Sequence, residues 1–445
     1  MLDASGLVAV KAVAFQYEAD DAVGSLLATF REMVNHAIWL GRRQRIRGRF
    51  KLIKAVYDEF KRYGLHSHYT LNACEVAAAI LKNSERNHRS PVAKRLFLKL
   101  DNQTYRLENA TLRIPLKPRQ FITLKLKLGE YQGNSLNCTT LKRGSVTLTD
   151  SKVIVAFEKT EEGEPGYGSV LAYDTNELSL DGVLASPVEI KPIHVDLRGI
   201  AKIRADHFHR RRALQRRLAH CQRKLSAVLV RDREHERRRV DGVLHRVAKQ
   251  QVNLAKQTEA KIVLEDLKGI RRSVNKRVKR LNPHNKRLQP MSTHSKALKR
   301  RLNTWPFRRL HGFIEYKARW ADVSLSHVSA WNTSRTCVMC GCLLTGHRGV
   351  QDPNTRRLFQ CPRCGWTCNR HLNAALNLLR TQDEGRWFSP DRLPDEVMTV
   401  KRAYGEEAKP SADEDLTEPK RQTAGWQFIL SIALQPSGDC REEED

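Results

Sequence analysis

The stretch SVLAYDTNELSLDGVLAS at residues 169–186 decides the fold class of the second half of this chain. It holds two apolar runs separated by a polar turn, which predicts two adjacent strands, and PIHVDLRGIAKI predicts a third. Further along, KIVLEDLKGI has the pattern of a buried strand that ends in acids. Pro306 then opens a helix, and VSLSHVSA supplies one more strand. This order of strands and helices indicates an α/β sheet.

A strongly basic segment is interleaved with these strands. Two long basic helices are expected between about residues 204 and 258. Their expected apolar stripe consists of Leu214, Leu218, Cys221 and Leu225. Residues 268–310 contain 15 Lys plus Arg and no Asp or Glu, which is too one-sided for a neutral solvated surface. Trp305 and His311, near the end of this tract, are assigned to the core rather than to base stacking.

The composition of the whole chain points to a polyanionic partner. The 445 residues include 79 Lys plus Arg against 49 Asp plus Glu, a formal net charge of +30. Nucleic acid is therefore the leading candidate. An anionic membrane surface is the alternative, but no apolar run approaches the roughly 18 residues of a membrane span. MLDASGLVAVKAVAF lacks the basic-then-apolar layout of a secretory signal, so a cytoplasmic protein without a membrane partner is expected.

The N-terminal part is organised differently. LVAVKAVAF alternates like a strand, and apolar residues at helical spacing follow at 22–40 and near 72–82. Alternating segments return between 111 and 158, separated by Gly, Asn and Asp turn signals. Residues 1–160 are therefore expected to form a small β domain with a helical insertion at about 20–105. EEGEPGYG then indicates a linker.

The last segment, residues 383–445, is net acidic. It contains 16 acidic and 8 basic residues and is rich in Pro, Ser and Glu. This composition predicts a mostly disordered tail.

The cysteines form the most specific motif. Six of the ten lie between residues 337 and 368, and in a reducing compartment they indicate a metal site rather than disulfides. Two Cys-x-x-Cys knuckles are separated by 20 residues, which is the spacing of a four-thiolate zinc site. The expected ligands are Cys337, Cys340, Cys361 and Cys364. Cys342 and Cys368 are expected to stay outside the set. A closed four-sulfur site leaves no position for water, so this zinc is expected to be structural.

Several ordered motifs closely resemble one known family. NTSRTCVMCG, FQCPRCGW and NRHLNAALNLL resemble the C-terminal end of TnpB proteins, which are insertion-sequence-encoded RNA-guided nucleases related to type V CRISPR effectors. WPFRRLHGFIEYKARWADV, KIVLEDLKGIRR and LAYDTNELSLDG are similar to successive parts of the family's RuvC-like domain. The resemblance covers roughly residues 168–380.

This resemblance implies a domain plan. An RNase H-like RuvC domain is expected at 168–336, a zinc ribbon at 337–368 and the last RuvC helix at 369–382. The N-terminal β domain resembles the family's wedge-like domain in general plan, and its helical insertion is expected to take part in guide and target recognition.

Cleavage of a phosphodiester with magnesium or manganese needs carboxylates that hold the ions against the scissile phosphate. Asp174 follows the apolar run VLAY and Glu265 ends the apolar run IVL, so both are suitably placed at strand ends. Their order matches the first and second catalytic motifs of the family. Asp196 and Asp266 are the runners-up.

The third catalytic position departs from the family. There the last Asp before Asn-Ala-Ala falls two residues before the position of Asn373, and this chain has His371 instead. Asn369 is a suitable N-cap, so the helix itself is expected to form. Histidine can bind a metal through a neutral nitrogen, but it adds no negative charge and favours softer ions such as manganese over magnesium.

Two functions therefore remain open. The resemblance implies an RNA-guided DNA endonuclease, encoded by or derived from a transposon, with a guide RNA and a target DNA as partners. Asp174, Glu265 and His371 are then its catalytic residues. The alternative is a nuclease-deficient RNA-guided DNA-binding protein that acts like a repressor. A third hypothesis, a zinc-ribbon nucleic-acid binder without a guide, is disfavoured by the set of catalytic motifs.

Overall fold

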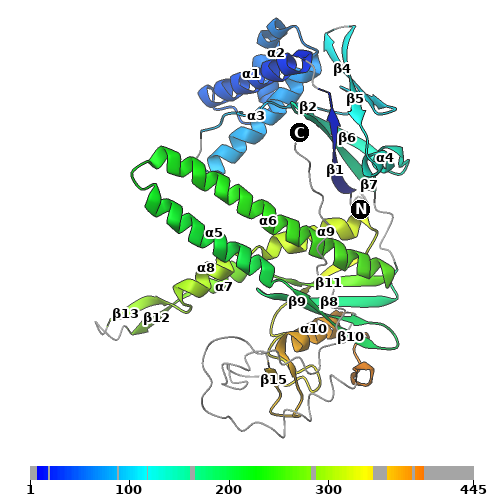
Figure 1. Ribbon diagram of the computed structural model, residues 1–445, viewed down its shortest axis with the longest axis vertical. Coiled ribbons are helices and arrows are strands. Elements are labelled where there is room, and N and C mark those ends of the chain that lie inside the picture. Colours follow the sequence, from blue (N-terminus) through cyan, green and yellow to red (C-terminus); the bar gives the residue numbers. More distant parts are fainter. Residues whose placement is uncertain are drawn as a thin grey trace. The chain divides into compact units, whose positions relative to one another are not determined.

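The chain divides into two compact units, residues 1–163 and 164–445. The computed structural model describes residues 8–18, 21–87, 90–117, 119–160, 166–281, 287–343, 358–382 and 386–394 (Figure 1). The expected linker at 161–168 lies mostly outside the described residues, and so does nearly all of the expected tail at 383–445. Each unit is described by itself.

Unit 1 contains an antiparallel sheet. Its strands are β1 (Val8–Tyr17), β2 (Leu98–Leu100), β3 (Arg106–Glu108), β4 (Thr111–Lys117), β5 (Gln120–Lys127), β6 (Lys142–Leu148) and β7 (Lys152–Thr160). They lie in the order β2-β6-β7-β1-β5-β4-β3. In β1, buried Val13, Phe15 and Tyr17 alternate with exposed residues, because successive side chains of a strand point to opposite faces.

Helices are inserted between β1 and β2 of unit 1. They are α1 (Asp21–Arg43), α2 (Arg49–Phe60), the 3-10 turn η1 (Lys61–Tyr63) and α3 (Ser67–Asn87), and α4 (Glu130–Asn137) follows later. The helices expected at 22–40 and near 72–82 correspond to α1 and α3. The pattern missed α2, which buries only Leu52, Val56 and Phe60, and α4, which buries no residue.

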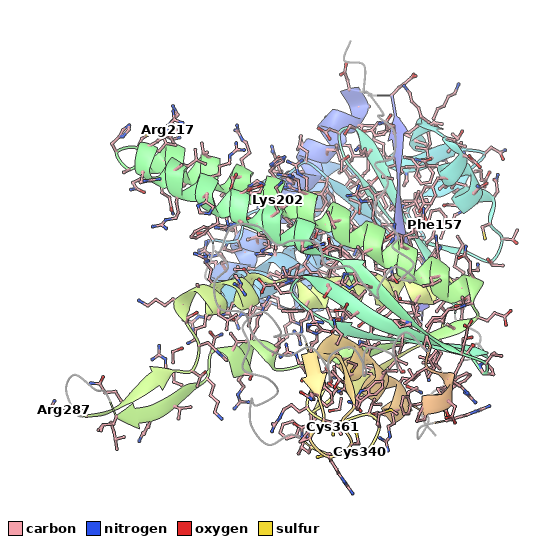
Figure 2. The ribbon with its side chains drawn as sticks, turned by 60° about the horizontal axis from the view of Figure 1, so that its bottom comes forward. Phe157, Lys202, Arg217, Arg287, Cys340 and Cys361 are labelled. Atoms are coloured by element: carbon pink, nitrogen blue, oxygen red, sulfur yellow. The ribbon has the colours of Figure 1, made fainter. Side chains whose placement is uncertain are left out.

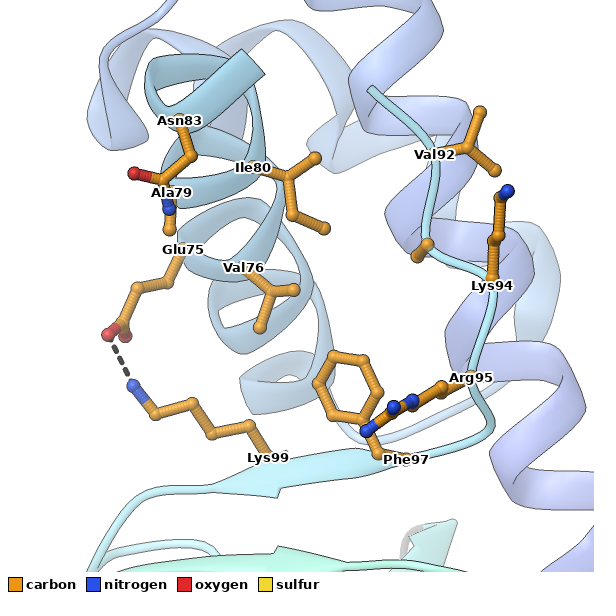
Figure 3. A pocket seen from close by; sticks show the side chains of 11 residues that line it. Glu75, Val76, Ala79, Ile80, Asn83, Val92, Lys94, Arg95, Phe97 and Lys99 are labelled. Atoms are coloured by element: carbon orange, nitrogen blue, oxygen red, sulfur yellow. Dashed lines mark hydrogen bonds and ion pairs between the residues drawn. The ribbon is translucent and has the colours of Figure 1, made fainter. Parts of the chain in front are cut away.

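A pocket of about 500 Å³ lies between α3 and the segment that leads into β2. Figure 3 shows Val76, Ile80 and Phe97 on its walls and the ion pair between Glu75 and Lys99 at one side. The lining includes a single acidic residue, so the pocket lacks the paired carboxylates that a metal site of hard donors requires.

Unit 2 is built on a mixed sheet. Its strands are β8 (Ser169–Thr175), β9 (Ser179–Ala185), β10 (Ile190–Asp196), β11 (Ala260–Asp266) and β14 (Leu325–Ser329), in the order β10-β9-β8-β11-β14. The first three, which the sequence predicts as strands, run antiparallel, and β11 runs parallel to both β8 and β14. Every residue of β8 is buried, which is expected for a central strand covered on both faces.

Helices cover both faces of this sheet (Figure 1). They are α5 (Arg198–Arg217), α6 (Gln222–Gln257), α9 (Phe307–Trp320) and α10 (Arg370–Thr381). Leu171 and Tyr173 belong to the core shared with α6 and α9, whereas Val170 and Ala172 belong to the core shared with α10. The two-residue period of β8 therefore separates the two cores. Trp305 and His311 are 2% and 5% exposed, so their assignment to the core is confirmed.

The basic segment of unit 2 forms helices and a hairpin. The stripe expected from Leu214 to Leu225 is wrong as the face of one helix, because α5 ends at Arg217 and Leu218 and Cys221 cap the turn into α6. Beyond β11 come α7 (Ile270–Val274), β12 (Arg277–Leu281), β13 (Leu288–Ser292) and α8 (Lys296–Thr304). Figure 2 shows the β12–β13 hairpin, with Arg287 at its end, extending away from the sheet.

The cysteine knuckles precede α10. The second knuckle lies between β15 (Leu358–Gln360) and β16 (Thr367–Asn369), and residues 344–357 are outside the described part. A short 3-10 turn, η4 (Pro390–Arg392), follows α10. Across the described residues, no helix has both the length and the apolar character that spanning a bilayer requires.

Candidate functional site

Three acidic side chains lie on neighbouring strands of the unit 2 sheet. Asp174 is on β8, Asp181 is on β9 directly opposite it in register, and Glu265 is on β11. Their exposed fractions are 8%, 7% and 6%. On each strand, the apolar residue two positions away packs against α10, so the three acids share the α10 face of the sheet. The structure thus brings the two predicted acids together and adds a third.

Glu265 is the most deeply buried of these acids. Its Oε1 accepts a hydrogen bond from the backbone N–H of Thr175 at 2.8 Å. Burial and the neighbouring negative charge of Asp174 raise the pKa of Glu265 to about 8, although the hydrogen bond opposes this rise. Near neutral pH a carboxyl group in this environment has a strong affinity for either a proton or a cation.

His371 lies in the first turn of α10 and contacts Asp174. Asn369 caps the helix as predicted, because its side-chain oxygen accepts a hydrogen bond from the His371 backbone N–H at 2.9 Å. The imidazole Nδ1 lies 3.0 Å from Oδ2 of Asp174. The same oxygen accepts a hydrogen bond from the Asn176 amide at 2.7 Å. His371 therefore uses one ring nitrogen to hold a carboxylate, and its Nε2 remains for other contacts.

Asp181 is the acid that the sequence interpretation missed. Its Oδ1 lies 2.5 Å from Nδ1 of His194 on β10, and its Oδ2 accepts hydrogen bonds from Ser179 and Asn176. Burial raises the pKa of Asp181, but the hydrogen bonds from His194 and Ser179 outweigh it, so the net shift is downward. The sequence did contain a signal for Asp181, namely the short turn between the two predicted strands. A tight hairpin there pairs position 174 with position 181.

The runners-up occupy other environments. Asp196 is exposed and accepts hydrogen bonds from the backbone and side chain of Arg198, where it stabilises the start of α5. Asp266 pairs with Lys268 at 3.0 Å just beyond β11. Both acids thus have local basic partners, in contrast to the buried acids.

The four predicted zinc ligands lie close together and next to α10. Their sulfur atoms all lie within 4.8 Å of one another. The Sγ atoms of Cys337 and Cys364 are 3.6 Å apart, and those of Cys340 and Cys361 are 3.5 Å apart. Figure 2 labels Cys340 and Cys361, one from each knuckle. Tetrahedral zinc with Zn–S bonds of about 2.3 Å needs sulfurs separated by about 3.8 Å, so the donor set fits zinc.

The backbone of each knuckle is turned by a glycine. Gly341 and Gly365 have φ values of 71° and 68°, a left-handed conformation that glycine adopts without steric cost. Each donates its N–H to the carbonyl of the first cysteine of its knuckle, Cys337 or Cys361. Cys342 and Cys368 remain outside the set, as expected.

Comparison with known proteins places the chain in a family. Residues 307–378 match the model of the Cas12f1-like TNB domain, and residues 26–115 match that of the uncharacterized protein MJ0013 family. The TnpB-like protein MJ0751 of Methanocaldococcus jannaschii is 29% identical over 299 residues, which span 65% of this chain and 97% of that protein. The chain belongs to the TnpB family.

The chain is also similar to two further proteins. The uncharacterized protein MJ0752 of the same organism is 39% identical over 74 residues, covering 16% of this chain and 95% of that protein. The cryo-EM structure of a Cas12f1-sgRNA-target DNA complex has a TM-score of 0.53 at 12% identity, covering 83% of this chain and 98% of that one. At this identity the likeness concerns the fold.

The carboxylates of this TnpB protein have the donor chemistry that magnesium and manganese prefer. Asp174, Asp181 and Glu265 offer hard oxygen atoms, and His371 adds a nitrogen that suits manganese better than magnesium. Within the described residues, only the four cysteines gather three or more donor atoms this tightly. The donor oxygens of the acids are therefore spaced more widely than the ligands of one enclosed metal ion. Such an open arrangement leaves coordination positions that a bound phosphate can fill.

The raised pKa of Glu265 predicts a pH-dependent stability of the protein without added divalent ions. A folded-state pKa of about 8 lies above the ordinary value of 4.5. The contribution of Glu265 to the free energy of unfolding is therefore complete below pH 4.5 and is lost as the pH rises through 8. We expect Glu265→Gln, which removes the buried charge, to raise the melting temperature by several degrees at pH 8.5 and by less at pH 5.5. Thermal unfolding at both pH values measures this. An equal rise in melting temperature at both pH values would contradict the raised pKa of Glu265.

Proposed function

We propose that this protein is an RNA-guided DNA endonuclease that hydrolyses phosphodiester bonds with divalent metal ions. The proposal rests on the convergence of Asp174, Glu265 and His371 on one face of the sheet, from three elements far apart in the sequence. Burying acids next to one another is unfavourable without a compensating cation. The structure with the matching fold is a complex of Cas12f1 with sgRNA and target DNA, and we infer both kinds of partner for this chain.

The metal site would use Asp174 and Glu265 as oxygen ligands, with His371 beside them. A bound magnesium or manganese ion supplies Lewis acidity that activates water and stabilises the leaving oxygen. The chain orients these ligands: the Thr175 N–H fixes Glu265, and the Asn176 amide fixes Asp174. Burial keeps bulk water away, which strengthens the attraction between carboxylates and cations.

The basic elements of unit 2 supply contacts to nucleic-acid phosphates. The β12–β13 hairpin carries exposed Arg277, Lys279 and Arg287. A separate hollow of about 440 Å³ beside the β8–β9 hairpin is lined by residues that include Lys202, Arg204 and Arg300. Such contacts neutralise phosphate charge without selecting sequence, so sequence choice would come from pairing with the guide RNA.

A second candidate function is RNA-guided DNA binding without cleavage. The observation that favours it is the 3.0 Å contact between His371 Nδ1 and Asp174 Oδ2. A neutral imidazole at this position adds no negative charge for metal binding and occupies an oxygen of a predicted ligand. A protein with this site would act by occupying its target DNA, as a repressor does.

The experiment that separates the two begins with the RNA that copurifies with the full chain. Sequencing this RNA gives the guide and hence a matched target DNA. With that target we expect slow cleavage in magnesium and faster cleavage in manganese, since manganese accepts nitrogen ligands more readily. His371→Asp should raise magnesium-dependent cleavage about tenfold or more while guide-dependent DNA binding stays the same.

Three outcomes decide between the candidates. Loss of cleavage in His371→Ala, from a wild type that cuts, supports His371 as part of the catalytic site. Tight guided binding without cleavage in either metal supports the second candidate. Recovery of random cellular RNA alone contradicts both, because neither works without a defined guide.

A further inference from the structure

We propose that Asp181 is a ligand of the catalytic metal and replaces the carboxylate that the family has at the position of His371. This inference rests on the metal site of the proposed function. Asp174, Glu265 and Asp181 would then provide the three carboxylates, and His371 would be a positioning residue that holds Asp174 through Nδ1.

The position of Asp181 supports this assignment. It lies opposite Asp174 in the register of β8 and β9 and on the face of the sheet that α10 covers. The amide nitrogen of Asn176 donates to Oδ2 of Asp174 at 2.7 Å and to Oδ2 of Asp181 at 3.3 Å. One small group therefore contacts both carboxylates, so they face a common point.

The local charges give an independent reason to expect a cation. Among the described residues, no Lys or Arg forms an ion pair with Asp174, Asp181 or Glu265, although the chain carries a net charge of +30. The partners of the two aspartates are the imidazoles of His194 and His371. Three buried carboxylates without a fixed positive charge repel one another, and divalent cations bound beside them remove the repulsion.

The contacts of Asp181 resemble those of an oriented metal ligand. His194 holds Oδ1, and Ser179 donates to Oδ2 at 2.6 Å, which fixes the direction of the carboxylate. A carboxylate oxygen has two lone pairs, so Oδ1 of Asp181, which contacts His194 alone, keeps one lone pair for a metal ion, whereas Oδ2 already accepts two hydrogen bonds. Hydrogen-bond partners behind a ligand commonly contribute to metal affinity.

The test uses the zinc-loaded full chain with its copurified RNA and Fe²⁺ as the probe ion. With ascorbate and peroxide, bound Fe²⁺ generates radicals that cut the polypeptide nearby. We expect cuts around residues 174–181 and near 265 that Mn²⁺ suppresses. Asp181→Asn should require about ten to a hundred times more Fe²⁺ for the same cutting. Asp196→Asn, an exposed acid on the adjacent strand, is the matched control and should cut like wild type.

A rescue separates ligation from a purely structural role. In the double variant Asp181→Asn with His371→Asp, the number of carboxylates returns to three, so we expect the Fe²⁺ requirement to fall back toward that of wild type. A structural defect in the hairpin would not be rescued by a change on α10. Zinc content and melting temperature verify that each variant is folded.

The outcomes keep this inference separate from the proposed function. Unchanged cutting in Asp181→Asn, no rescue by His371→Asp, or no metal-dependent cutting in wild type would each overturn it. If wild type binds Fe²⁺ as expected but never cleaves matched DNA, the ligand assignment of Asp181 stands and the endonuclease proposal fails.

Discussion

Cys361→Ser is expected to remove zinc from the protein and to disorder α10. Freshly purified wild type should contain about one zinc per chain, and the variant close to none, because a structural zinc site contributes on the order of 10 kcal/mol of binding free energy to folding. Phe359, Cys361 and Val338 share one apolar core with Leu372 and other residues of α10. Loss of the ion therefore loosens the helix that carries His371.

Metal analysis and limited proteolysis measure this effect. The matched control is Cys342→Ser, since Cys342 lies two residues after Cys340 but outside the ligand set. This control should keep its zinc and resist protease within α10 as wild type does. Zinc-free wild type would contradict the assignment, and equal zinc loss in both variants would move Cys342 into the site.

Asp174→Asn and Glu265→Gln are expected to abolish target cleavage, with a loss of about 10³-fold or more. Each removes one negative charge from a buried site, and metal ions supply several kcal/mol of transition-state stabilisation in such sites. Guide-dependent DNA binding should stay within about twofold of wild type, because it depends on phosphate contacts elsewhere on the chain. Cleavage and filter-binding assays on the same matched target separate the two effects.

Asp266→Asn is the control for this pair. Asp266 follows Glu265 directly, but its side chain pairs with Lys268 instead of the buried acids. Its variant should cleave at the wild-type rate under the same conditions. Full activity in Asp174→Asn would show that the catalytic carboxylates lie elsewhere in the protein.

Local sequence patterns determined several features of this site. The two apolar runs in residues 169–186, with a polar turn between them, predicted the β8–β9 pair. The cysteine spacing predicted the four-sulfur set that the structure assembles. The cap at Asn369 predicted the start of the helix that carries His371. Each of these signals spans few residues, and its physical cause is equally local.

Other features were beyond the reach of local patterns. The four residues from Leu214 to Leu225 were expected to form one apolar stripe, but a turn at 218–221 interrupts them, and spacing alone does not reveal a turn without Gly or Pro. The helix α2 has buried Leu52, Val56 and Phe60 at helical spacing, but apolar Phe50 and Tyr57 are exposed and obscure this pattern.

The sequence by itself determined the family, the four cysteines that cluster and the strands that carry Asp174 and Glu265. Only the tertiary structure decided that Glu265 accepts a hydrogen bond from the Thr175 N–H beside Asp174 and that His371, 197 residues further along the chain than Asp174, contacts the Asp174 carboxylate. The physical reason is that strand register and the docking of α10 arise from packing between segments distant in sequence. Which charged groups lie together in the site depends on that packing, and local sequence patterns do not reveal it.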